Sequence, residues 1–228
     1  MPIFGPTLTP EEYARADHSS RGTVLISSQW SLASLAAAIL ALRLYVKISF
    51  KKGLWWDDWL LIASWILCVA VCILTTILVK EYSMGHHTYD IVIPNLTTWI
   101  NILDSRAVCV ITALAWTKTA FAVTLLRLTT GKTKAFVWFL IITLNVTLAF
   151  GAMSPWIQCQ PLAKRWHPQL EGQCWPGSTG INIFIATGAL SSLYDFILAF
   201  LPWTFLYSLT LKKKEKFGIL VAMSMGVV

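Results

Sequence analysis

The sequence predicts an all-α, polytopic bundle of transmembrane helices. Of its 228 residues, 56% are hydrophobic and 13% are charged, and the mean hydropathy is +0.64. Soluble domains carry about twice this share of charged residues. The apolar residues form long uncharged blocks instead of the stripes of amphipathic helices or the alternation of half-buried strands. Helices are expected because a helix satisfies its own backbone hydrogen bonds within lipid.

Blocks long enough to cross a bilayer recur along the chain. A spanning helix needs about 20 apolar residues to cross a hydrocarbon core about 30 Å thick. Five blocks have this length: 23–46, 59–79, 107–126, 135–153 and 181–211. A sixth block, 217–228, would cover only ~18 Å as a helix. We therefore expect a seven-helix type of bundle that is cut short, with an extracellular segment, 1–22, before a transmembrane domain, 23–228.

Lysine and arginine alternate between successive loops. Eleven lie in one set of loops, and five lie in the opposite set together with the amino-terminal segment. Positive residues collect on the cytoplasmic side, so the sequence predicts an extracellular amino terminus, most simply in the plasma membrane. The sequon Asn95-Leu96-Thr97 then falls outside, where Asn95 is a candidate glycosylation site. The net charge of +7 is thus a topology signal, and no nucleic-acid partner is expected.

The five cysteines lack the spacing of a zinc site, and no metal is expected. Cys159 and Cys174 lie in the fourth connection, on the outer and oxidising face. A bond between them would close a loop that constrains the unfolded chain by about 3 kcal/mol. We favour this disulfide; in the alternative, Cys109 at the outer part of the third span pairs with one of them.

Two opposite charges inside the predicted spans point to function, because a charge in a bilayer is costly unless it is paired or solvated. Lys118 lies nine residues before Arg127, and thus ~14 Å from the inner end of the third span. Asp195 lies seventeen residues before Lys212, ~25 Å from the inner end of the fifth, so the two are offset by about ten ångströms. We interpret them as a pair that locks the bundle or lines a polar ligand cavity.

Polar residues near the outer face have simpler interpretations. Asp104 and Arg106 precede the third span and are expected to be a solvated helix start, with Asp104 near the positive end of the helix dipole. In the loop after the second span, Gly85 is expected to form a turn. His86 and His87 are expected to be exposed or to touch the outer loop, with weak metal binding or pH sensing as the alternative.

Two adjacent carboxylates open the second span, in the stretch GLWWDDWLLIASW. One of Asp57 and Asp58 can cap the first amide groups of that helix, and the surrounding tryptophans are typical of a membrane interface. The other is expected to pair with Arg43, Lys47 or Arg127 on the cytoplasmic side. Arg127 is then either a topology anchor or a point of contact with a cytoplasmic partner.

Several short motifs follow one another in a distinctive order. DDWLL opens the second span, a GxH loop follows it, and Lys118 and Arg127 occupy the third span. Cys-Gln-Pro, then Trp, then Cys follow in the outer loop, and Asp195 and Pro202 lie in the fifth span. This order resembles that of the fungal rhodopsin-domain integral membrane proteins, from about residue 20 to the end. Ser83 departs from it, since the family's outer motif GxGxH usually has its first glycine there.

The resemblance implies a seven-helix membrane protein related to proposed G-protein-coupled receptors. The lipid bilayer and a heterotrimeric G protein are the partners it implies, and it implies no particular ligand. It does not imply retinal, because rhodopsins hold retinal through a lysine of their last helix and Lys118 is in the third. No cofactor is therefore expected.

Three classes of function are compatible with these features. The preferred one is a receptor-like sensor of an extracellular stimulus; the alternatives are a transporter or channel, and a membrane enzyme or accessory protein of a secondary-metabolite pathway. A charged pair within the spans would suit a transporter. Asp57-Asp58 lacks the third carboxylate of a DDxxD magnesium motif, and the chain has no GxSxG elbow. No catalytic residue is therefore predicted.

Overall fold

The computed structural model describes residues 19–50, 53, 55–87, 95–127, 129, 131–165 and 170–208, with side chains up to residue 201. It contains five α-helices in this part of the chain: α2 (Gly22–Ser49), α3 (Trp56–Glu81), α4 (Leu96–Leu126), α5 (Lys132–Ile157) and α6 (Gly177–Ser208). All five are long and apolar enough to cross a membrane. The predicted all-α helix bundle is confirmed. The expected sixth block, 217–228, and most of the segment 1–22 lie outside the described residues.

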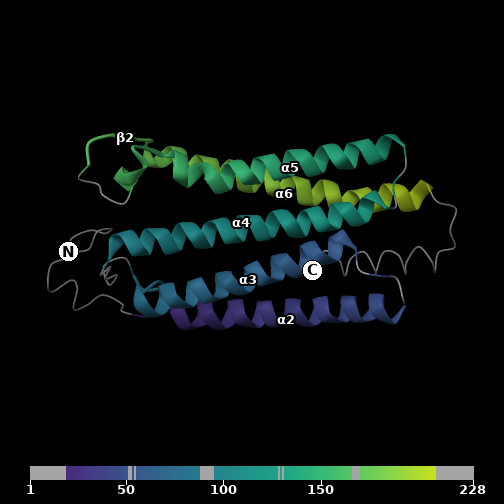
Figure 1. Cartoon of the computed structure of the whole chain (residues 1–228), viewed down its shortest axis with the longest axis horizontal. Helices are drawn as coiled ribbons and strands as arrows, with labels where there is room; N and C mark the ends of the chain where they lie inside the picture. Colours follow the sequence, from purple (N-terminus) through teal and green to yellow (C-terminus); the bar gives the residue numbers. More distant parts are fainter. Residues whose placement is uncertain are drawn as a thin grey trace.

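Successive helices run in alternating directions (Figure 1). α4 packs against both α3 and α5, α2 packs on α3, and α6 packs on α5. The carboxyl ends of α2 and α4 therefore meet the amino ends of α3 and α5 at one end of the bundle, which we call the α2–α3 end. The opposite end carries a small disulfide-linked hairpin and is called the hairpin end.

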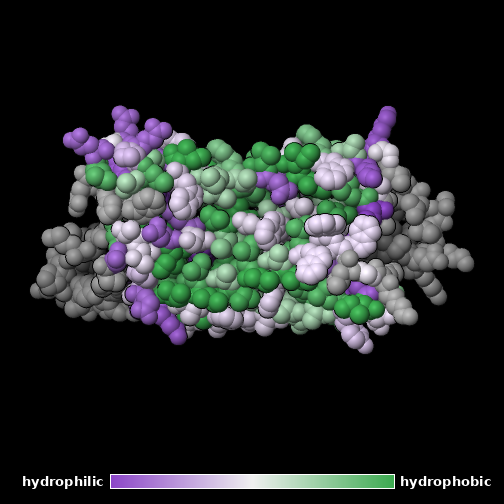
Figure 2. All heavy atoms as spheres, in the orientation of Figure 1, coloured by the Kyte–Doolittle hydropathy of each residue, from purple (hydrophilic) through white to green (hydrophobic). Residues whose placement is uncertain are grey.

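The exterior of the bundle is apolar. Large side chains such as Phe139 and Val146 on α5 and Ile185 on α6 are about two-thirds exposed, at 60%, 64% and 64%. Figure 2 shows hydrophobic residues across the middle of one face, with the most hydrophilic residues mainly toward its two ends. The buried core is smaller and is formed where α4, α5 and α6 meet, around Leu125 and Val137. Such a distribution suits helices whose outer surface is solvated by lipid tails.

The start of α4 differs most from its expected position. It begins at Leu96, well before residue 107, and the Asn95 side chain accepts a hydrogen bond from the backbone amide of Thr98 at 3.3 Å. The length of the uncharged block underestimates the length of the helix. α4 also includes two charged residues, Asp104 and Arg106, which have polar partners within the bundle. The other four helices begin within four residues of their expected starts.

The hairpin closes the connection between α5 and α6. Strands β1 (Cys159–Gln160) and β2 (Gln173–Cys174) pair in antiparallel register with Cys159 opposite Cys174, and a one-turn 3₁₀ helix, Leu162–Arg165, lies between them. These two cysteines form a disulfide, whereas Cys109 is a free thiol. The favoured cysteine pair is confirmed, and the alternative pairing through Cys109 is wrong.

Candidate functional site

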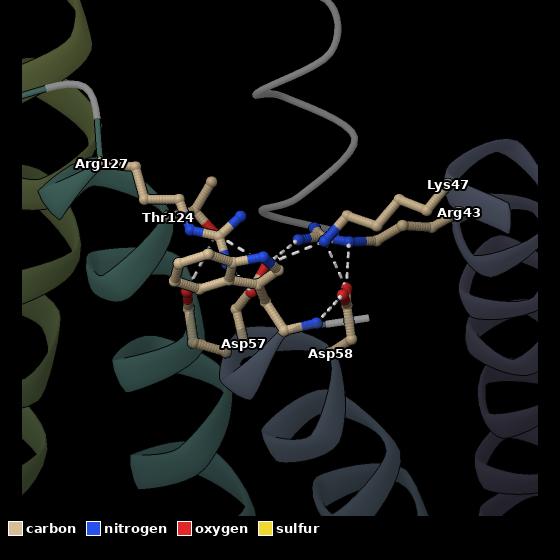
Figure 3. Close-up of polar contacts among 8 residues, drawn as sticks. Arg43, Lys47, Asp57, Asp58, Thr124 and Arg127 are labelled. Carbon is tan, nitrogen blue, oxygen red and sulfur yellow. Dashed lines mark hydrogen bonds and ion pairs between the residues drawn. The ribbon is translucent and has the colours of Figure 1, made fainter. Parts of the chain in front are cut away.

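Five charged side chains from three helices converge at the α2–α3 end (Figure 3). We call them the aspartate cluster: Arg43, Lys47, Asp57, Asp58 and Arg127. Both carboxylates lie in the first turn of α3, and neither residue is exposed (0% each). The cations come from either side: Figure 3 shows Arg43 and Lys47 reaching from α2, and Arg127 reaching from the end of α4.

Asp57 is the carboxylate that joins the three helices. Its Oδ2 accepts hydrogen bonds from Arg43 Nη2 at 3.1 Å and from Lys47 Nζ at 3.0 Å. Its Oδ1 accepts one from Arg127 Nη2 at 2.8 Å. Arg43 and Lys47 are four residues apart, so one face of α2 presents both. A buried carboxylate needs such partners, because leaving it without any compensating cation typically costs about 3–5 kcal/mol.

Asp58 organises the start of α3. Its Oδ2 accepts a hydrogen bond from the backbone amide of Trp55 at 3.1 Å, and the Asp58 amide donates to the Trp55 carbonyl at 3.0 Å. Its Oδ1 accepts a hydrogen bond from Lys47 at 2.5 Å. The carboxylate thus satisfies an amide at a helix start and lies where the helix dipole is positive. Asp58 therefore both caps α3 and holds α2.

Arg127 connects α4 to α3 through two different contacts. Besides its bond to Asp57, its guanidinium lies over the Trp55 ring, 3.9 Å from the centroid. The Arg127 side chain is 35% exposed, in contrast to the fully buried aspartates. Thr124, one turn earlier on α4, places its hydroxyl 3.4 Å from Asp57 Oδ2. Arg127 is thus the member of the cluster that another molecule can reach most easily.

The second predicted site pair, Lys118 and Asp195, joins α4 to α6. Lys118 Nζ lies 2.9 Å from Asp195 Oδ2, and it also donates to the backbone carbonyl of Ser191 at 3.0 Å and contacts the Ser191 hydroxyl. The expected offset of about ten ångströms along the bundle is wrong. Figure 1 shows the described part of α6 extending past the end of α4, so these two helices do not end at the same depth. The Asp195 side chain is 58% exposed and that of Lys118 is 12% exposed.

A third ion pair lies near the hairpin end. Arg165, in the 3₁₀ turn, donates two hydrogen bonds to Asp104, at 3.0 and 2.7 Å, and a third to Gln158 at 2.6 Å. Arg106 donates to Thr75 on α3 at 2.8 Å. The expected solvated helix start is therefore wrong: Asp104 is only 8% exposed and lies two turns inside α4. Its bonds to Arg165 hold the connection between α5 and α6 against the bundle.

The remaining predicted residues lie apart from these ion pairs. Asn95 is exposed at the start of α4. Gly85 has a φ of +99°, and a Cβ there would lie 2.8 Å from the Gly22 amide nitrogen, so this turn needs a glycine. Its carbonyl accepts a hydrogen bond from the Arg21 amide at 3.0 Å, just before α2. His87 is exposed beside it.

Comparison with known proteins decides the family. The profile of the fungal rhodopsin domain matches residues 42–228. The chain belongs to this family. The fungal rhodopsin domain so defined begins one residue before Arg43, and it contains the aspartate cluster, the Lys118–Asp195 pair and the disulfide. No curated protein and no solved structure matches the chain significantly. The family and the spanning helices together identify a multi-pass membrane protein.

Sequence reasoning missed several partners in this fungal rhodopsin domain. Ser191 lies one helical turn before Asp195, a spacing that could have indicated a shared face. Thr124 lies three residues before Arg127, and this spacing could likewise have indicated a shared face. No periodicity could have identified Arg165, because it lies in an irregular connection whose position depends on the hairpin.

Proposed function

We propose that this fungal rhodopsin domain is a receptor-like sensor of an extracellular stimulus in the plasma membrane. The α2–α3 end faces the cytoplasm, where a heterotrimeric G protein is the proposed partner, and the amino terminus is extracellular. The positive residues at the α2–α3 end, among them Arg43, Lys47 and Arg127, support this orientation. The sites that carry the proposal lie at different depths of the same central helix, α4.

The observation that carries the proposal is the Arg127–Asp57 bond. Asp57 is fully buried and keeps two cations from α2 when Arg127 leaves, so its charge remains compensated. Arg127 is a third exposed and can instead contact a partner. The bond therefore provides two arrangements of the α4 end, docked on α3 or released, and a switch needs such a two-state element. A partner that binds the released arrangement would shift the population toward it.

We propose the Lys118–Asp195 pair as the polar contact site for a ligand. Lys118 lies on α4, nine residues before Arg127, and more than half of the Asp195 side chain on α6 is exposed. A ligand that contacts Asp195 would alter its bond to Lys118 and with it the packing of α4 on α6. Because α4 also carries Arg127, a shift of this helix would reach the α2–α3 end.

The test measures basal guanine-nucleotide exchange by heterotrimeric G proteins of the source cell with the full-length protein in nanodiscs. Arg127→Gln releases the end of α4, and we expect exchange to rise about five-fold or more. Arg127→Lys keeps the charge but loses the planar guanidinium stack on Trp55, so an intermediate rate is expected.

Lys134→Gln is the matched control, because Lys134 is an exposed cation at the start of α5 at the same end of the bundle. It should leave basal exchange unchanged. Equal basal exchange in the folded wild type, Arg127→Lys and Arg127→Gln proteins would refute the switch. If Arg127→Gln fails to fold, the comparison of Arg127→Lys with the wild type still tests the switch.

A further inference from the structure

A groove lies between α2, α3 and α4, next to the aspartate cluster, with which it shares Arg43. Its volume is about 320 Å³. Most of its lining is aliphatic, including Ala36, Leu40 and Val110, and Arg43 lines it as well. Leu114 on α4 also lines the groove while being 43% exposed, so the groove opens sideways between the helices.

The dimensions of the groove match a single lipid chain. Its lining on α3 extends from Leu61 to Val71, ten residues, or ~15 Å along the helix. That is half of a hydrocarbon core about 30 Å thick, the depth that one leaflet's acyl chains occupy. Between the described helices of a membrane-spanning bundle, a sideways apolar opening lies next to the bilayer, where lipid is the molecule present at the highest local concentration.

The end of the groove near the aspartate cluster is positively charged and incompletely satisfied. The cluster contains three cations and two carboxylates, which leaves a surplus of one positive charge. Arg43 Nε is buried and has no hydrogen-bond partner, since Asp58 Oδ1 lies 3.6 Å away. An unsatisfied buried donor on a cation is costly, and a phosphate oxygen is a strong acceptor for it.

The tryptophans of α3 place this end at the headgroup level. Trp55, Trp56 and Trp59 surround the start of the helix with exposures of 54%, 78% and 59%. Exposed tryptophans are enriched where a membrane meets water. Arg43 therefore lies at the depth where a phospholipid has its phosphate, and the apolar groove continues from it toward the middle of the bilayer.

We propose that this groove binds one anionic phospholipid of the surrounding leaflet. One acyl chain lies along the lining residues of α2, α3 and α4, and the headgroup phosphate accepts a hydrogen bond from Arg43 Nε. The surplus charge of the cluster favours a net negative headgroup over a zwitterionic one. This lipid site depends on Arg43 and the groove, and it is independent of any G protein.

Native mass spectrometry of the full-length protein from nanodiscs of equimolar phosphatidylcholine and phosphatidylserine tests the proposal. The wild type should retain one phosphatidylserine molecule. Ala36→Trp fills the groove without altering any charge and should lose this lipid, whereas Ala38→Trp, at an exposed position two residues along α2, should retain it. Arg43→Gln should abolish the preference for phosphatidylserine. Equal retention by the two tryptophan variants would overturn the site.

A second measurement locates the lipid. Cys68 lines the groove, and replacing Cys72 and Cys109 by serine leaves it as the single free thiol beside the disulfide. Its alkylation by N-ethylmaleimide should be several-fold slower in the mixed nanodiscs than in phosphatidylcholine alone. Protection by added oleate but not by phosphatidylserine would replace the phospholipid with a fatty acid. Equal rates in both nanodiscs would contradict an anionic lipid in the groove.

Discussion

At the residue scale, neighbouring side chains of the same type do different work. Asp57 joins three helices through cations from α2 and α4, whereas Asp58 turns toward its own helix start and accepts the Trp55 amide. The difference follows from helix geometry, because successive residues point about 100° apart around the axis. Backbone conformation also singles out residues, and the loop after α3 contains two positive φ values at Ser83 and Gly85.

Ser83→Gly should stabilise the protein. Ser83 has a φ of 52°, a left-handed conformation that costs a side-chain-bearing residue about 1–2 kcal/mol. Glycine adopts it readily but loses more entropy on folding, so we expect a net gain of about 1 kcal/mol. Thermal unfolding in detergent should show a midpoint about 2–4 °C higher. Gly85→Ala, where a Cβ meets the backbone of Gly22, should lower it, and a lower midpoint for Ser83→Gly would contradict the argument.

At the element scale, α4 is the helix to which the others are tied. It carries Arg127 toward α3, Lys118 toward α6 and Asp104 toward the 3₁₀ turn, so every ion pair described outside the α2–α3 contacts involves it. Apolar packing alone does not hold helices together strongly in lipid, since lipid tails solvate apolar side chains equally well. Polar contacts therefore fix which helices are neighbours and how they are aligned.

Exchanging the charges of the Lys118–Asp195 pair should preserve it. We expect Lys118→Asp and Asp195→Lys, made singly, to lower the yield of monodisperse protein. Each replaces the ion pair, whose charged atoms lie 2.9 Å apart, with two neighbouring like charges that repel each other. The double variant should recover stability, with a coupling of about 1 kcal/mol or more. Size-exclusion chromatography and thermal unfolding measure it. A double variant that is no more stable than the less stable single variant would show that the contact is unimportant.

At the scale of the whole molecule, the bundle has two chemically different ends. The hairpin end carries the disulfide and the Asp104–Arg165 pair, whereas the α2–α3 end carries the aspartate cluster. α4 has 31 residues, about 46 Å as a helix, and so exceeds a ~30 Å core. Part of this helix must stand outside the hydrocarbon region, and its exposed start at Asn95 is at the hairpin end.

Glycosylation tests which end is extracellular. When the protein is expressed in eukaryotic cells, we expect one N-linked glycan at Asn95, and Asn95→Gln should remove the endoglycosidase-sensitive mass shift. Asn145 is a matched control, because its sequon lies within α5 and its side-chain amide donates to Thr119 at 2.9 Å. Asn145→Gln should leave the shift unchanged. A glycan-free wild type with a modified site engineered at the α2–α3 end would reverse the proposed orientation.

The sequence by itself determined the all-α class, the family and the approximate position of four of the five described helices. These follow from local properties: uncharged length decides whether a helix can span lipid, and short motifs lie in a fixed order along the chain. The candidate residues Asp57, Asp58, Arg43 and Arg127 could also be named, since charges beside or within apolar blocks stand out in a membrane protein.

Only the tertiary structure decided how those residues combine. The depth of Lys118 relative to Asp195 depends on how far α6 slides past α4, a quantity that no single helix encodes. The early start of α4 depends on Arg165 and Thr75, which arrive from other elements to satisfy its charged residues. The groove beside Arg43 exists because three separate helices leave space between them. Spacing along one helix is a local property, whereas alignment between helices results from all their contacts together.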